Sequence, residues 1–144
     1  MASAPRILVL AGDAVEAAAC ELALETGLPG CSVITERTAE GGLSAARSGG
    51  VDVVVVGAEL PDGHELDVIR SLSAEPAAPP IVAVLGRGSE RLAAAVLTAG
   101  ATDALAAGRD FTVALADSVA IAYGYALRGR RNRPPMFFRH YQYA

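Results

Sequence analysis

Three short runs of apolar, mostly β-branched residues constrain the fold of this chain more than any other feature. They lie at residues 6–11, 51–56 and 81–85. Beyond their first residues they do not alternate apolar with polar side chains, as a strand with one solvent-exposed face would. Such runs are typical of strands in a parallel sheet that is covered on both faces. Two weaker runs, at residues 31–35 and 102–105, raise the number of predicted strands to five.

Helix signals separate these strands. Asp13, followed three residues later by Glu16, forms a capping box at the start of the first predicted helix. The predicted buried face of this helix consists of Val15, Ala18, Ala19 and Leu22. Thr38 caps a second predicted helix, which ends at residue 47. Gly41 and Gly42 in its first turns cost about 1 kcal/mol each relative to alanine.

Three further helices complete the alternation. One follows the turn at residues 61–63, the next is capped by Ser89, and the last is capped by Asp110. Strand and helix therefore alternate five times, and the connections between them are too short to contain additional antiparallel strands. This pattern predicts a doubly wound α/β fold with right-handed crossovers. In such a fold, ligands and chemistry are expected beyond the carboxyl ends of the strands.

Length and composition exclude several classes of protein. A chain of 144 residues is long enough for one domain and too short for two of ordinary size. No apolar run reaches the ~20 residues of a membrane helix, and the first residues lack the features of a signal peptide. Cys20 and Cys31 have neither metal-ligand spacing nor a CxxC pattern. We therefore expect a cytoplasmic domain with no membrane association, no bound cofactor and no metal site.

Three segments carry characteristic turns in a fixed order. Residues 51–63 form an apolar run followed by Leu-Pro-Asp-Gly, residues 79–85 form a second apolar run after two prolines, and residues 98–105 contain Ala-Gly-Ala before a short run. These segments resemble the third strand and its turn, the fourth strand, and the turn into the fifth strand of the receiver domain of bacterial two-component response regulators. The resemblance implies a flavodoxin-like fold with five parallel strands in the order 2-1-3-4-5. It also implies a receiver-like domain at residues 1–128, followed by a tail at residues 129–144 that departs from the family.

The chemistry of that family depends on five positions. It needs an aspartate that accepts a phosphoryl group, two acidic residues that help to hold a divalent cation, a hydroxyl and a lysine. The resemblance places Ala11 and Gly12 at the acidic pair, Gly57 at the phosphoacceptor, Leu85 at the hydroxyl and Ala107 at the lysine. The chain contains no lysine at all. The resemblance therefore implies a degenerate pseudo-receiver that cannot form an aspartyl phosphate at the usual place.

Two acidic residues near these positions leave an alternative open. Asp13 follows the acidic-pair positions by one residue, and Glu59 lies in the loop after Gly57. A shift in register would turn them into a weak cation site, or would make Asp13 a phosphoacceptor. The simpler role for Asp13 is to cap a helix.

The last two predicted helices carry few charges. Residues 111–127 are apolar nearly all round, whereas a surface helix normally keeps a polar stripe. We expect this face to be packed in a homodimer, since receivers commonly pair through the surface of these two helices. The alternative explanation is that alanine is frequent throughout the chain and that its small side chain has little apolar surface to bury. The predicted interface residues are Leu92, Val96, Ala104, Val113, Ile121, Tyr123 and Tyr125.

The tail differs from the body in charge and composition. The acidic residues all lie at or before Asp117, whereas arginines and aromatic residues gather at the end of the chain. The predicted contact residues are Arg130, Arg131, Arg133, Phe137, Phe138 and Tyr141. We expect them to dock on an acidic protein surface, of the body or of a partner. Single-stranded nucleic acid is the less favoured partner because the acidic body repels phosphates, and a disordered terminus is a further alternative.

These features together predict a non-enzymatic, phosphorylation-independent pseudo-receiver. Its expected role is that of a protein–protein interaction module in two-component, or phosphorelay, signal transduction. The alternative is a small-ligand sensor that uses the pocket left by the missing acidic residues.

Overall fold

The computed structural model describes residues 4–86, 88–106, 108, 110–128 and 137–139. Its strands are β1 (Arg6–Leu10), β2 (Ser32–Glu36), β3 (Val53–Val56), β4 (Ile81–Leu85), β5 (Asp103–Ala106) and β6 (Phe137–Arg139). Its helices are α1 (Ala14–Gly27), α2 (Ala39–Arg47), α3 (Glu65–Ser73), α4 (Ala93–Ala99) and α5 (Phe111–Leu127). A short 3-10 helix, η1 (Glu90–Leu92), precedes α4.

The strands form one sheet in the order β2-β1-β3-β4-β5-β6, and every neighbouring pair is parallel. The predicted order 2-1-3-4-5 and the doubly wound α/β class are therefore confirmed. β6 is an addition to the five predicted strands. It comes from the tail, pairs Phe137 with Asp103 of β5, and also contacts α4. A three-residue strand is too short to give a periodic signal in the sequence.

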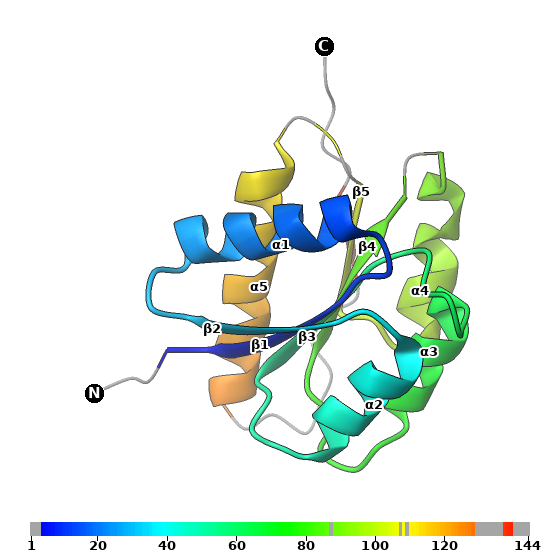
Figure 1. The fold of residues 1–144 in the computed structure, drawn as a ribbon, viewed down its shortest axis with the longest axis horizontal. Coiled ribbons are helices and arrows are strands. Elements are labelled where there is room, and N and C mark those ends of the chain that lie inside the picture. The colour runs from blue at the N-terminus through cyan, green and yellow to red at the C-terminus, as the bar shows by residue number, and fades with distance from the viewer. Residues whose placement is uncertain (1–3, 87, 107, 109, 129–136, 140–144) are drawn as a thin grey trace.

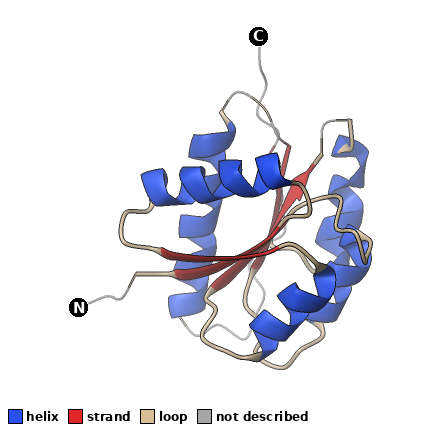
Figure 2. Ribbon diagram, in the orientation of Figure 1, coloured by secondary structure: helices blue, strands red, loops and turns tan. Residues whose placement is uncertain are grey.

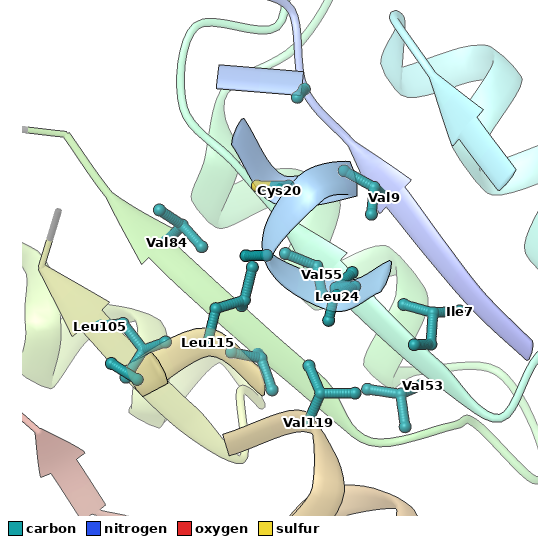
Figure 3. Close-up of a cluster of buried hydrophobic side chains, with 14 of the residues drawn as sticks. Ile7, Val9, Cys20, Leu24, Val53, Val55, Val84, Leu105, Leu115 and Val119 are labelled. Carbon is teal, nitrogen blue, oxygen red and sulfur yellow. The ribbon is translucent and has the colours of Figure 1, made fainter. Parts of the chain in front are cut away.

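The sheet lies between two layers of helices, as Figure 2 shows in red and blue. α1 and α5 cover one face, and α2, α3 and α4 cover the other. Alternate residues of β1, β3 and β4 point into the two cores, which explains why these strands are apolar throughout. Figure 3 shows the core beneath α1 and α5, where Leu24 and Leu115 pack against Val9 and Val55.

The face of α1 that packs on the sheet differs from the predicted one. Val15 and Leu22 are 76% and 65% exposed, and Ala18 and Ala19 also face solvent. The buried face consists of Ala17, Cys20, Ala23 and Leu24. α1 is apolar on both faces, so periodicity in the sequence does not decide which of them meets the sheet.

Gly42 of α2 has a packing role. A Cβ at Gly42 would overlap the side chain of Leu10, which is fully buried in β1. Glycine therefore lets α2 lie close to the sheet, and this close approach offsets its weak helix propensity. Thr38 caps the helix as predicted, since its side chain accepts the N–H of Gly41 at 3.0 Å.

No helix in the described part of the chain is both long enough and apolar enough to cross a membrane.

Candidate functional site

The loops that follow the parallel strands gather at one edge of the sheet (Figure 1). Gly57, which follows β3, donates its N–H to the carbonyl of Leu10 at the end of β1, with an N–O distance of 2.7 Å. Ala11 and Leu85 are fully buried at the ends of β1 and β4. The structure thus brings Ala11, Gly12, Gly57 and Leu85 to this edge, and Ala107 lies outside the described residues.

Glu16 fills the space beside Gly57. Its carboxylate oxygen Oε1 lies where a Cβ at Gly57 would be, so the two cannot coexist in these positions. Burial, followed by the charge of Asp13, raises the pKa of Glu16 to about 7, while the N–H of Ala58 opposes the shift and Glu59 adds to it. A carboxylate therefore still stands at the end of β3, but it belongs to α1.

Glu16 does not complete the predicted capping box. Asp13 makes the predicted cap, since its carboxylate accepts the N–H of Glu16 at 3.0 Å. The side chain of Glu16 points toward Gly57, as its overlap with a Cβ at that position requires. The prediction of a reciprocal hydrogen bond, from the backbone N–H of Asp13 to the side chain of Glu16, is therefore wrong.

Glu65 brings a second buried carboxyl group to the site. It is the first residue of α3 and is 7% exposed. Burial, followed by the charge of Glu16, raises the pKa of Glu65 to about 7. The preceding residue, His64, is exposed and caps α3, with its Nδ1 accepting the N–H of Leu66 at 3.1 Å.

Glycine at position 12 lets two loops meet. A Cβ there would overlap the backbone carbonyl of Glu59, which itself has a φ of 62°. Arg37, which follows β2, holds the same region by donating to the carbonyls of Ala11 and Gly12 at 2.9 and 2.6 Å. The side chain of Arg37 thus fixes the loop between β1 and α1 from the outer strand.

Asp13 and Glu59 do not belong to a larger cluster of possible metal ligands in the described part of the chain. No group of three or more His, Cys, Asp or Glu residues there is placed to hold a metal ion. Asp13 is engaged as a helix cap, and Glu59 is exposed.

Asp62 does more than the turn-stabilising role that its position suggests. Its carboxylate accepts the N–H groups of Ala39 and Glu40 at 2.6 and 3.0 Å, which caps α2 from the β3–α3 loop. These two hydrogen bonds lower the pKa of Asp62. The loop that contains the Leu-Pro-Asp-Gly turn is therefore tied to the start of α2.

The predicted interface residues have different environments. Val113 is 70% exposed on α5, and Ile121 is also exposed. Leu92, Tyr123 and Tyr125 are half-buried, and Tyr125 lies under the guanidinium of Arg128 at 5.6 Å from the ring centre. Val96 and Ala104 are fully buried within the domain. These last two side chains support the core and cannot reach a partner, so their assignment to a surface is wrong.

Much of the tail falls outside the described residues. This applies to Arg130, Arg131, Arg133 and Tyr141. Phe137 and Phe138 belong to β6, the outermost strand of the sheet, which pairs with β5.

No protein-family model and no curated protein sequence matches this chain at a significant level. Solved structures do match. The signal receiver domain of an HD domain-containing protein from Pseudomonas fluorescens Pf-5 has a TM-score of 0.79 at 18% identity, over 90% of this chain and 94% of that chain. The signal receiver domain of a putative Luxo repressor protein from Vibrio parahaemolyticus gives 0.77 at 18% identity, over 88% and 95%. A response regulator receiver domain protein from Clostridium thermocellum gives 0.70 at 20% identity, over 87% and 95%. These likenesses show that the chain has the receiver-domain fold.

The two glutamates of the site were not among the predicted site residues. Glu16 reads in the sequence as part of a capping box, and Glu65 reads as an acidic residue in the first turn of a helix, where negative charge is common. The resemblance identifies Gly57 as a position without a carboxylate. It does not identify the side chain that fills the space beside Gly57. One signal was available, because a glycine at the end of a buried strand leaves room that another side chain must fill.

Proposed function

We propose that this chain is a phosphorylation-independent pseudo-receiver, a non-enzymatic cytoplasmic module of two-component signalling that acts through contacts with other proteins. The observation that carries the proposal is at Gly57. No side chain there can accept a phosphoryl group, and the carboxylate of Glu16 fills the adjacent space. Ala11, Gly12 and Leu85 supply no charged or hydroxyl group either. The receiver-domain fold supports the proposed class of protein, a module of two-component signalling.

Treatment of the full chain with acetyl phosphate and Mg²⁺ tests the first part of this proposal. We expect the intact mass to stay unchanged, while an active receiver domain treated in parallel gains one phosphoryl group. A gain by this chain that is lost in Asp13→Ala or in Glu16→Gln would overturn phosphorylation independence. These two variants also identify which carboxylate accepts the group.

The proposed contact is a homodimer through the exposed side of α5. Val113 and Ile121 lie on this helix with large exposed apolar side chains. Measurement of the molar mass in solution at several concentrations tests it. We expect a dimer that Ile121→Glu weakens and that the matched change Val15→Glu, on the exposed face of α1, leaves intact. A strict monomer with and without residues 129–144 would contradict the dimer.

The alternative of a small-ligand sensor has less support. The pocket that it requires would be lined by Ala11, Gly12, Gly57 and Leu85, yet Glu16 occupies the space beside Gly57 and the carbonyl of Glu59 lies against Gly12. A ligand that binds this folded site must raise the melting temperature. A thermal-shift screen that includes Glu16→Ala, which empties the space, separates the two functions.

A further inference from the structure

The two outer strands of the receiver fold, β2 and β5, are built differently. The side chains of β2 are exposed or half-buried, with Ser32, Thr35 and Glu36 among them. β5 is the last of the five strands of that fold, yet all four of its residues are buried. Charged side chains are among the features that protect a strand edge exposed to water. β2 is therefore suited to remain an edge, whereas β5 is suited to be covered by another strand.

The outer edge of β5 presents the backbone groups of alternate residues. Thr102, just before β5, donates its N–H to the carbonyl of Ile81 at the start of β4, with an N–O distance of 2.7 Å. Successive residues of a strand direct their backbone groups to opposite neighbours. Those of Asp103 and of Leu105, two residues further on, therefore face away from β4. They form the edge with which another strand can pair.

The elements around this edge, α4, α5 and β5, carry acidic charge and no basic charge (Figure 1). α4 has no charged residue, and α5 has only Asp117. Asp103 of β5 is 1% exposed, and its carboxylate accepts the hydroxyl of Ser118 on the α5 side of the sheet. β6 carries Arg139 and no acidic residue. The edge therefore suits a basic segment better than an acidic one.

β6 covers the outer edge of β5 in this structure. It pairs with β5 in parallel, with Phe138 opposite Ala104 and Arg139 opposite Leu105, and it also contacts α4. It is only three residues long, so it forms few backbone pairings. Its attachment to the same chain compensates, since a tethered segment has an effective concentration on the order of millimolar. A strand contact that is weak in itself can therefore persist within one chain.

We propose that the outer edge of β5 is a strand-docking site for a partner protein, and that β6 blocks this site within the chain. The partner segment is extended, carries adjacent aromatic residues followed by a basic one, and pairs with β5 in the parallel register of β6. Main-chain pairing of this kind gives affinity, while side chains at alternate positions give specificity. The inference goes beyond the proposed function, because this site is separate from Gly57 and from the exposed side of α5.

The experiment opens the site in the full chain with Phe138→Pro. Proline removes the N–H at the centre of β6 and is poorly accommodated in a paired strand. We expect amide exchange to rise at Asp103 and Leu105, which face β6, and to stay slow at Thr102, which faces β4. Gln142→Pro, beyond the end of β6, is the matched control and leaves all three amides protected. Unchanged exchange in β1 and β3 shows that the variant keeps its fold.

A fluorescent synthetic peptide of residues 134–144 then serves as the probe for a partner segment. We expect the Phe138→Pro chain to bind this peptide at least about ten-fold more tightly than the parent chain, in which the site is occupied by β6. Binding restores the protection of Leu105. A peptide with Arg139→Glu binds more weakly, because the charges around the edge are acidic. A peptide with Phe138→Pro does not bind.

Three results would overturn the inference. Persistent protection of Asp103 and Leu105 in Phe138→Pro would show that β6 does not cover the edge. Equal binding of the peptide by the parent and Phe138→Pro chains would place the peptide elsewhere, and absence of binding by the Phe138→Pro chain would remove the docking site. Each result leaves phosphorylation independence and the α5 dimer standing. A phosphoryl adduct, in contrast, would remove the proposed function without changing peptide binding.

Discussion

At the scale of single residues, the site depends on two positions that fit only together. Gly57 has no side chain, and Glu16 extends from α1 into the space that this leaves. The carboxyl group that reaches the end of β3 is attached to a helix, has a buried oxygen atom and carries a raised pKa. A protonated carboxyl group is a poor nucleophile.

Gly57→Asp, which introduces the residue type that the receiver resemblance implies at this position, is expected to destabilise the chain by about 1–3 kcal/mol. The new Cβ would overlap Oε1 of Glu16 and lie 3.1 Å from the carbonyl oxygen of Leu10. Urea unfolding measures this loss. The matched control is Gly124→Asp, because a Cβ at Gly124 meets nothing within 4 Å.

A second variant tests the cause of that loss. The double change Gly57→Asp with Glu16→Ala removes the overlap and the second charge, so it should recover most of the lost stability. If the double variant is no more stable than Gly57→Asp alone, the overlap with Glu16 is not the cause of the loss.

At the scale of elements, the sequence predicts the type and order of helices and strands better than it predicts which face of a helix packs on the sheet. The strands at residues 6–10, 53–56 and 81–85 lie within the predicted runs at 6–11, 51–56 and 81–85, because a β-branched run covered on both faces needs no choice of side. α1 is different, since apolar residues occupy both of its faces and only the position of the sheet selects one. Prediction of the site has the same limit. Gly57 could be identified from the local sequence, whereas Glu16 and Glu65 reach the site only through tertiary packing.

The two apolar faces of α1 give a direct comparison of the same substitution. Leu24→Ala is expected to cost about 2–5 kcal/mol, because Leu24 is fully buried under the helix. Leu22→Ala removes the same atoms from an exposed position and should change the free energy of unfolding by less than about 0.5 kcal/mol. Thermal or urea unfolding of the two variants measures both values. Equal losses would contradict the observed orientation of α1.

The close approach of α2 to β1 gives another comparison. Gly42→Ala is expected to destabilise the chain by about 1–3 kcal/mol despite the better helix propensity of alanine, because its Cβ would overlap Leu10. Gly124→Ala in α5 meets no neighbour and should stabilise the chain by about 0.5–1 kcal/mol. Urea unfolding distinguishes the two signs. A stabilising Gly42→Ala would show that α2 lies further from the sheet.

At the scale of the whole molecule, carboxyl groups act on stability in two opposite directions. As a carboxylate, Asp62 ties the β3–α3 loop to the start of α2, since it accepts the N–H groups of Ala39 and Glu40. Glu16 and Glu65 have buried oxygens and fit the fold best when protonated. The same net acidic chain is therefore stabilised by deprotonation at one place and by protonation at another.

These directions predict how stability depends on pH. The folded chain binds protons at Glu16 and Glu65 up to about pH 7, above their ordinary pKa of 4.5. The folded state thus holds more protons than the unfolded state between these values, and stability falls as pH rises through this window. The pKa of Asp62 lies below its ordinary 3.8, so its contribution is present above that value and is lost as pH falls.

We therefore expect the free energy of unfolding to be greatest near pH 4, between the ordinary pKa of Asp62, 3.8, and that of the two glutamates, 4.5, and to fall as the pH rises toward 8. Urea unfolding at a series of pH values measures the profile. Glu65→Gln should flatten its alkaline side, and Asp62→Asn should lower stability above pH 4 while leaving the alkaline slope unchanged. A parent chain whose stability rises from pH 5 to pH 8 would contradict the buried, protonated state of the pair, because only groups with lowered pKa values produce a rise in that direction.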